Sequence, residues 1–422
     1  MDGILTNPGR NILFHAGKGT SRRHEMTGQS PIYGLRPASL RLLTGLTLAA
    51  LFAAVLFSAM GVERLPGMAG TVFSDFDLFH AVARLTLDGR LAEAYDYETF
   101  HAAQTDLGGP VHQMTWTYPP PFDLVLAPLG LLTSGIAYLV FTLFGFAFYL
   151  WALRKLAGRY FTLALLAAVP ATLISLRTGQ NGCLMAALAA TSCHFVLASR
   201  PSKAGMVLGL MVIKPHVGLG LGLWSIFSRR WAMAVTSLIV VAVIVLLSLG
   251  LLGADVWRAF LGATKEASGL LAEGRYPHFR MASVYSTFRS LNASADVAFA
   301  AQVASALTGL AAIVLAAIKL NARAGMAVAF FLVPTFSPYM YDYDLVLYGP
   351  AFALLLPELD RAGRRVLVLP ALALAWIAGG TGLVQNTRGG ADGIVAQTSF
   401  AGVAALVLGL YVLGVLWRMP KD

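Results

Sequence analysis

Long apolar runs separated by short polar turns dominate the hydropathy pattern of this chain. In order along the sequence they cover residues 42–60, 136–153, 159–176, 181–198, 204–227, 231–252, 296–318, 324–336, 343–358, 366–382 and 396–417. Most approach the length of about 20 residues that a helix needs to cross a bilayer core about 30 Å thick. Since Lys214-Pro215 interrupts the run 204–227, we interpret this run as a hairpin of two helices. The pattern then predicts an all-α polytopic membrane protein with about twelve transmembrane helices.

Two segments near the N-terminus depart from this pattern. Residues 61–121 are not fully apolar, but apolar side chains recur at helical spacing within 75–87 and within 91–100. We therefore expect an extracytoplasmic loop that carries amphipathic helices on the membrane surface. Residues 122–132 are apolar but too short to cross the core at about 1.5 Å per residue, so a re-entrant or interfacial segment fits them better.

The composition supports the membrane assignment and excludes other classes of protein. Of the 422 residues, 57% are hydrophobic and 12% are charged, and the mean hydropathy is +0.69. These values exclude a disordered chain, a collagen-like fibre and a small disulfide scaffold, and they argue against a soluble enzyme. Cys183 and Cys193 would lie about 15 Å apart along one helix, too far for a disulfide bond, and are interpreted as apolar fillers.

The placement of basic residues predicts the orientation in the membrane. About forty polar, basic residues precede the first apolar run; this is not the pattern of a signal peptide, and such charge keeps that end in the cytoplasm. If Lys214-Pro215 is the outer tip of its hairpin, the short basic clusters between spans share one side. They contain Arg154, Lys155, Arg159, Arg200, Lys203, Arg229, Arg230, Lys319, Arg323, Arg361, Arg364 and Arg365.

This orientation divides the chain into three parts. They are a basic cytoplasmic tail (1–41), a single transmembrane domain (42–418) and a cytoplasmic tail (419–422). Because the basic residues anchor inner loops against anionic lipid, the net charge of +10 requires no nucleic-acid partner. The remaining polar segments all fall on the outer face, where we expect one site: 61–121, 177–181, Lys214, the basic loop 253–295, 337–344 and 383–394.

Three candidate residues belong to the first outer loop and its end. Asp75 lies within 74–79, soon after the first span, where a carboxylate can act as a general base toward a hydroxyl acceptor, and Asp77 is a candidate for substrate binding. The alternative is that Asp75 caps the helix that follows. Tyr118 stands before three prolines that fix an extended backbone. It is either a substrate contact or an interfacial anchor.

Two short connections between apolar runs carry hydrogen-bond donors or a charge. The turn 177–181 suits a sugar or a phosphate, but also an ordinary interfacial turn, through Arg177, Gln180 and Asn181. Lys214 interrupts an apolar run, and a cation at membrane depth costs at least about 2.5–3.5 kcal/mol on insertion scales. We interpret Lys214 as a partner for a phosphate, assisted by His216, against the alternative that it snorkels to the interface.

Acidic and aromatic side chains alternate in the block 337–344. Tyr341, Asp342 and Asp344 fit a carbohydrate cleft with aromatic faces stacked on sugars, or an aromatic belt in which Asp342 caps the next helix. The outer loop 253–295 is net basic, which favours an anionic ligand such as a lipid phosphate, or is a solvated loop. Its candidate phosphate-binding residues are Lys265, Arg275, Arg280 and Arg289. Since no Cys/His cluster has metal-ligand spacing, no metal site is expected.

Five of these features occur in an order that resembles glycosyltransferase family 87, of the multispanning GT-C superfamily. They are Asp-Phe-x-x-Phe at 75–79, Tyr-Pro-Pro at 118–120, Gly-Gln at 179–180, Lys-Pro at 214–215 and Ser-Pro with aromatic residues from 337. The resemblance extends from about residue 42 to 358. It implies a GT-C-like bundle and a metal-independent enzyme without a cofactor. The donor would be a polyprenyl-phosphate sugar, most often mannose, on the extracytoplasmic face.

The resemblance also implies roles for individual residues. Asp75 would deprotonate the acceptor hydroxyl, the anomeric carbon would invert, and Lys214 with arginines of the outer loop would stabilise the leaving lipid phosphate. Many relatives have a His near position 344, within a Trp-x-His-Tyr-like block, where this chain has Tyr341-Asp342-Tyr343-Asp344. The departure makes Asp342 and Asp344 candidates for contacts with sugar hydroxyls and leaves the acceptor open between a lipid and a glycan.

The sequence therefore predicts an inverting glycosyltransferase of the bacterial inner (plasma) membrane. Its partners would be a polyprenyl-phosphate sugar, a lipid or glycan acceptor and membrane lipids. A transporter or flippase for a lipid-linked sugar is the alternative, which broken helices and internal repeats would favour. A non-catalytic membrane scaffold would explain the apolar mass but not the intramembrane Lys214.

Overall fold

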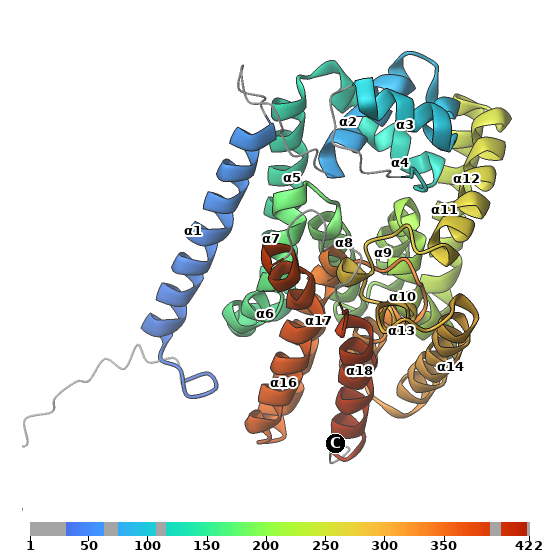
Figure 1. Ribbon diagram of the computed structural model, residues 1–422. Coiled ribbons are helices and arrows are strands. Elements are labelled where there is room, and N and C mark those ends of the chain that lie inside the picture. Colours follow the sequence, from blue (N-terminus) through green and yellow to red (C-terminus); the bar gives the residue numbers. More distant parts are fainter. Residues whose placement is uncertain (1–30, 63–74, 107–114, 389–397, 420–422) are drawn as a thin grey trace, which may run out of the picture.

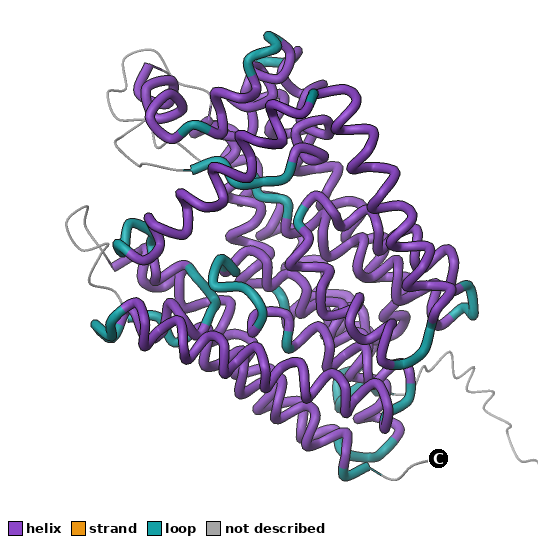
Figure 2. Tube along the Cα trace, turned by 90° about the vertical axis from the view of Figure 1, so that its right-hand side faces the viewer, coloured by secondary structure: helices purple, strands orange, loops and turns teal. Residues whose placement is uncertain are grey.

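The computed structural model describes residues 31–62, 75–106, 115–388 and 398–419. Over these residues the chain consists of helices joined by short connections, which Figure 2 shows from the side. The β-structure in the described part is limited to two isolated bridges, one between Ile32 and Leu35 and one between Met281 and Tyr341. The prediction of an all-α protein is confirmed.

Five helical segments are long and apolar enough to cross a membrane. They are α1 (Pro37–Val62), α5 (Ser134–Ala157) with its continuation through η3 (Gly158–Tyr160) into α6 (Phe161–Ala167), α11 (Trp231–Leu252), α14 (Ala295–Lys319), and η8 (Arg365–Leu367) with α17 (Val368–Arg388). The shorter apolar helices include α8 (Gly182–Leu197), α9 (Pro201–Gly209) with η4 (Leu210–Ile213), α15 (Ala322–Phe331) and α18 (Ala401–Trp417). The chain is a membrane protein by this measure, and the number of twelve crossings stays a prediction.

The shorter helices end where the sequence breaks them. α7 (Val169–Thr178) stops at Gly179, which has the left-handed conformation (φ +68°) that glycine adopts without steric cost. α10 (Pro215–Phe227) begins with Pro215 at its first position, where the missing N–H of proline is not needed. α9, η4 and α10 thus form the predicted hairpin, with Lys214 at its tip.

The basic clusters between spans meet at one end of the molecule. Arg159 pairs with Asp360 at 2.6 Å, and Arg323 lies 3.8 Å from Glu358. Both acids belong to α16 (Tyr348–Arg361), so three connections far apart in sequence share this end. Figure 1 shows the start of α1 and the C-terminal end of α18 there too. This arrangement agrees with the predicted sidedness of the basic loops.

Short helices form a cap at the opposite end. The cap consists of α2 (Asp75–Leu87), η1 (Leu91–Tyr95), α3 (Tyr97–Asp106), α4 (Pro120–Leu126), η2 (Ala127–Leu131) and α12 (Ala254–Ala272). The helix expected at 75–87 is present with these bounds, but its apolar side chains Phe76, Phe79 and Val82 are buried against protein rather than lipid. This apolar face of α2 packs on α4 and η2. Together α4 and η2 cover residues 120–131, which are too few to cross a bilayer.

Most of the expected outer loop 253–295 is also helical. It contains α12, η5 (His278–Arg280) and α13 (Val284–Ser290). α12 carries its charged residues on an exposed face, while Val256, Ala263 and Ala267 are buried toward the rest of the cap. The polar composition that suggested a loop is therefore that of an amphipathic surface helix.

Small residues allow the hairpin to pack closely on its neighbour. A Cβ atom on Gly205 would lie 2.3 Å from the carbonyl oxygen of Met233, and one on Gly209 would lie 2.6 Å from the side chain of Val240. Both neighbours belong to α11, so the backbone of α9 approaches the backbone and a side chain of α11 without room for a methyl group. Close packing of small residues is a main source of helix association in membranes, and here it fixes the height of Lys214.

Candidate active site

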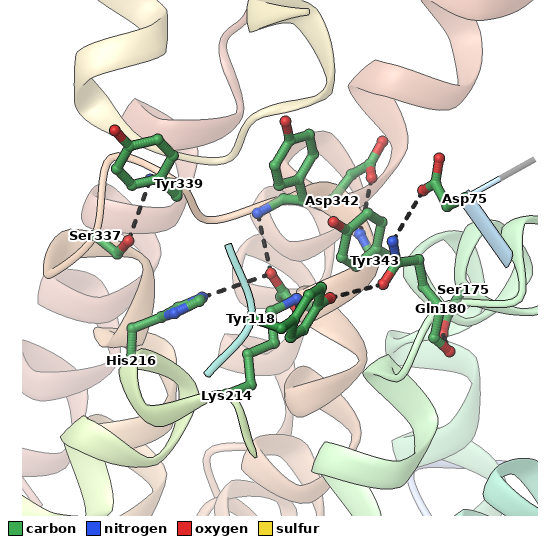
Figure 3. Close-up of polar contacts among 12 residues, drawn as sticks. Asp75, Tyr118, Ser175, Gln180, Lys214, His216, Ser337, Tyr339, Asp342 and Tyr343 are labelled. Carbon is green, nitrogen blue, oxygen red and sulfur yellow. Dashed lines mark hydrogen bonds and ion pairs between the residues drawn. The ribbon is translucent and has the colours of Figure 1, made fainter. Parts of the chain in front are cut away.

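Connections between helices bring most of the sequence-predicted site residues together. The connections are the turn between α7 and α8, the tip of the hairpin, η5 and η7 (Asp342–Leu347), and Asp75 opens α2 beside them. α7, α8 and α17 pack against η7, and α17 also packs against η5. Figure 3 shows polar side chains of this cluster that come from α2, the segment before α4, the end of α7 and the turn after it, the hairpin tip and the connection before α16.

Asp75 lies at the start of α2 with its carboxylate directed into the cluster. Its Oδ2 atom accepts a hydrogen bond of 3.1 Å from Gln180 Nε2 and lies 3.5 Å from Arg280 Nη2. Only 8% of the residue is exposed. An amide donor and a guanidinium therefore fix the direction of the buried carboxylate.

The amide of Gln180 is oriented by Tyr118. The Tyr118 hydroxyl donates a hydrogen bond of 3.0 Å to Gln180 Oε1, which leaves the amide nitrogen to face Asp75 (Figure 3). The prolines after Tyr118 place it at the start of α4, and its ring packs on Phe79 and Phe122 at centroid distances of 5.5 and 4.7 Å. The backbone is extended only as far as Pro119, because Pro120 and Pro121 are the first residues of α4, and this shorter segment positions a donor in the site.

Lys214 pairs with Asp344 in the interior of the protein. The Lys214 Nζ atom lies 2.5 Å from Asp344 Oδ1, and both side chains are buried. The ammonium also lies over the ring of Tyr343, 4.6 Å from its centroid. The lysine therefore does not snorkel to an interface, because its charge is neutralised where it stands.

Arg280 lies between two carboxylates. Its Nη2 atom is 3.5 Å from Asp75 and 3.6 Å from Asp342, yet it makes no hydrogen bond within the described residues. Its guanidinium also lies over the rings of Tyr341 and Tyr343, which stack on each other at 5.2 Å. The buried N–H of Arg280 is thus available to an anionic ligand.

Asp342 belongs to the connection between α15 and α16. Burial raises the pKa of Asp342 to about 6, although Arg280 beside it opposes this change. A glycine of α17, Gly382, leaves the space that the carboxylate occupies, since a Cβ there would lie 2.4 Å from Asp342 Oδ2. The carboxylate is not a helix cap: its Oδ1 atom accepts from the backbone N–H of Tyr343, the next residue.

His216 and Asn181 complete the cluster with unused polar atoms. His216 Nε2 lies 4.0 Å from Asp344 Oδ2 and has no hydrogen-bond partner among the described residues. The amide nitrogen and oxygen of Asn181 are buried and likewise unpartnered within that part of the chain. A buried amide without a partner is costly, so this position suits a polar ligand.

Other candidates from the sequence lie outside the cluster. Asp77 accepts a hydrogen bond from Ser134, and Arg289 holds the carbonyl groups of Ala272 and Ala293. Exposed positions away from the cluster are occupied by Arg177, Lys265 and Arg275, the last of which lies 3.4 Å from Glu273. Of the four basic candidates in 253–295, Arg280 alone contacts the carboxylates of the site.

The sequence did not single out Tyr343 or Asp123. Tyr343 lies between two candidate acids, and this alternation was the available signal. Asp123 is completely buried in α4, where it accepts hydrogen bonds from Tyr95 and Trp116. The available signal for Asp123 was that it is an acidic residue inside the otherwise apolar run 122–132.

Comparison with known proteins identifies the family. The family model described as glycosyltransferase family 87 matches residues 116–338, which is more than half of the chain. Tyr118, Gln180, Lys214 and Arg280 fall inside the matched segment, whereas Asp75 and η7 flank it. No curated protein and no solved structure matches the chain significantly. With its apolar helices and a buried polar cluster in the matched region, the chain belongs to glycosyltransferase family 87.

Proposed function

We propose that this membrane glycosyltransferase transfers a sugar from a polyprenyl-phosphate donor to a hydroxyl group of a lipid or glycan acceptor, with inversion, and that the sugar is mannose. The observation that carries the proposal is the placement of Asp75. Its buried carboxylate lies 3.5 Å from Arg280, and Arg280 and Lys214 both lie over the ring of Tyr343. A base and phosphate-binding cations are the two parts that this transfer needs.

In the proposed step Asp75 takes the proton of the acceptor hydroxyl. The acceptor oxygen forms a bond to the anomeric carbon as the bond from that carbon to the phosphate oxygen breaks. The electron pair of the broken bond leaves with the polyprenyl phosphate, and attack from the opposite face inverts the anomeric carbon. Gln180 supports this role because its amide holds Asp75 Oδ2 in place and leaves Oδ1 for the acceptor.

Arg280 and Lys214 are suited to the charge that develops on the leaving phosphate. Both are held by carboxylates, Arg280 at 3.5–3.6 Å and Lys214 at 2.5 Å. Arg280 is the better first contact, since its Nη2 makes no hydrogen bond to the described residues. Fixed cations in a site that excludes water stabilise developing charge without reorganisation.

We place the site toward the extracytoplasmic face of a bacterial inner membrane. α8 has 16 residues and α10 has 13, and each runs from the site to the basic end. At about 1.5 Å per residue the site then lies about 20–24 Å from that end, beyond the middle of a core about 30 Å thick. The basic end faces the cytoplasm by the positive-inside rule.

Replacing Asp75 by Asn tests the proposal. In Asp75→Asn we expect sugar transfer to fall by at least about 100-fold, because the general base is lost. Binding of the polyprenyl-phosphate sugar should persist, since Arg280 loses a competing carboxylate. The measurement uses purified protein in lipid vesicles, a panel of radiolabelled polyprenyl-phosphate sugars and membrane lipid extracts, without nucleotide sugar.

Asp88→Asn is the matched control, because Asp88 is an exposed acid just beyond the end of the same helix, α2. It should transfer sugar at the wild-type rate. Undiminished transfer by Asp75→Asn would remove Asp75 as the base. Movement of the intact donor between leaflets without transfer would instead establish a flippase.

A further inference from the structure

Asp123 is a buried carboxyl group without a basic partner in the described part of the chain. Its Oδ1 atom accepts a hydrogen bond of 3.0 Å from Trp116 Nε1, and its Oδ2 atom lies 2.6 Å from the Tyr95 hydroxyl. α4 belongs to the cap and not to a membrane-spanning segment. Burial raises the pKa of Asp123 to about 8, although both hydrogen bonds oppose this change.

The hydroxyl group of Tyr95 has two acceptors for one proton. It lies 2.6 Å from Asp123 Oδ2 and 2.8 Å from the carbonyl oxygen of Tyr118. If Asp123 is ionised, Tyr95 can serve only one of them. If Asp123 Oδ2 carries a proton, Asp123 donates a hydrogen bond to Tyr95, and Tyr95 donates one to the Tyr118 carbonyl. Every polar atom in this buried series of hydrogen bonds then has a partner.

The chain of contacts continues from Tyr118 to Asp75. The Tyr118 hydroxyl donates to Gln180, and Gln180 donates to Asp75. Phe79 of α2 packs edge to face against Trp116 and Tyr118, at 5.7 and 5.5 Å, so the start of α2 and this segment are in direct contact.

We propose that protonated Asp123 is a positioning residue that holds the Tyr118 segment and thereby orients Gln180 and the carboxylate of Asp75. The inference rests on the proposed function, in which Asp75 is the base. Ionised Asp123 takes the hydrogen bond of Tyr95, so the Tyr118 carbonyl loses its donor. The turnover number should therefore fall as the pH rises through about 8.

Most other ionisable groups on the elements around α4 are bound to groups other than Asp123. In the cap, His80 binds the Leu132 carbonyl, Arg84 binds the Gly130 carbonyl, and Asp75 binds Gln180. Glu266 of α12 shares a small cavity with Tyr95 and Trp116, and Glu93 of η1 pairs with Arg90. The remaining neighbours, α11, η2 and η4, have no ionisable side chain.

Infrared spectroscopy measures the proton on Asp123 without any substrate. The wild-type spectrum minus that of Asp123→Asn, both at pH 7, should contain the carbonyl band of a protonated carboxylic acid. The band should disappear when the wild type is brought to pH 10. A difference spectrum with only carboxylate bands at pH 7 would overturn the protonation of Asp123.

An asparagine at position 123 should make the same hydrogen bonds as protonated Asp123. Its Nδ2 can donate to Tyr95 while its Oδ1 accepts from Trp116, so kcat of Asp123→Asn should stay within about threefold of the wild type at pH 7. Because asparagine does not titrate, the fall above about pH 8 should be absent in this variant. An alkaline fall identical to that of the wild type would overturn the positioning role.

Tyr95→Phe removes the hydroxyl group that links Asp123 to the Tyr118 carbonyl. It should lower kcat by about tenfold, the effect of one lost hydrogen bond, with little change in KM for the donor. Tyr97→Phe is the matched control, because the Tyr97 hydroxyl has no hydrogen-bond partner among the described residues. Equal kcat for both variants would contradict the proposal.

The two proposals fail in different experiments. Full activity of Asp75→Asn would refute the base, while the infrared band of Asp123 would be unchanged. Absence of that band would refute the proton on Asp123, while the loss of activity in Asp75→Asn would stand.

Discussion

At the scale of single residues, the site depends on charges that neutralise one another in the protein interior. Lys214 and Asp344 form a buried pair, and Arg280 lies between Asp75 and Asp342. The cost of burying such charges is offset only while both partners are present. A phosphate that enters the site can therefore exchange one anionic partner of each cation for another.

Removing one partner of the buried pair should destabilise the fold, and removing both should not. Lys214→Met should lower the free energy of unfolding by about 3–5 kcal/mol, because Asp344 is left charged and buried. Lys214→Met with Asp344→Asn should recover most of that stability but not sugar transfer. Thermal unfolding in detergent and the transfer assay measure the two effects; a double variant as unstable as the single one would contradict the explanation.

At the scale of elements, broken helices deliver the polar residues to the site. α7 ends at Gly179, and α10 begins at Pro215 directly after Lys214. The height of the hairpin tip is set by α9 against α11, where Gly205 and Gly209 leave no space for a side chain. A change in this contact should therefore reach Lys214 although it lies outside the site.

Two glycine-to-alanine variants in the hairpin should have different effects on the free energy of unfolding. Gly209→Ala places a Cβ 2.6 Å from Val240 and should destabilise the protein by about 1–3 kcal/mol and reduce transfer. Gly222→Ala in α10 meets nothing within 4 Å and should be neutral or stabilising by up to about 1 kcal/mol, from helix propensity. Unfolding temperatures of the pair test this; equal temperatures would show that the α9–α11 contact tolerates a methyl group.

At the scale of the whole molecule, basic loops and the cap occupy opposite ends. Arg159, Arg323 and Arg365 reach acids of α16 at one end, while α2, α4 and α12 lie at the other (Figure 1). By the positive-inside rule, the end that carries the basic loops is the one expected to face the cytoplasm.

Cysteine labelling should locate the two ends. With Cys183 and Cys193 replaced by Ala, Asp88→Cys in the cap should react with a membrane-impermeant thiol reagent in intact spheroplasts. Ser202→Cys, exposed beside Lys203, should react only after the membrane is permeabilised. The reverse pattern would place the cap in the cytoplasm and contradict the proposed orientation.

Much of the site was accessible from the sequence because polar residues are rare in this chain. Lys214 and Asp344 each interrupt or border an apolar stretch at an energetic cost that marks them, whereas Asp75 was marked by its position soon after the first span. The basic loop 253–295 was harder to interpret, since its charges belong to an amphipathic helix. Arg280 differs from Lys265 and Arg275 only through the position of η5 in space.

The sequence by itself determined the membrane class, the all-helical fold and the placement of the basic loops between helices. These properties follow from apolar length and local charge, which act on each segment separately. Only the tertiary structure decided which polar residues meet. Gln180 reaches Asp75 across 105 positions and Lys214 reaches Asp344 across 130, and such contacts depend on how helices pack rather than on any local pattern.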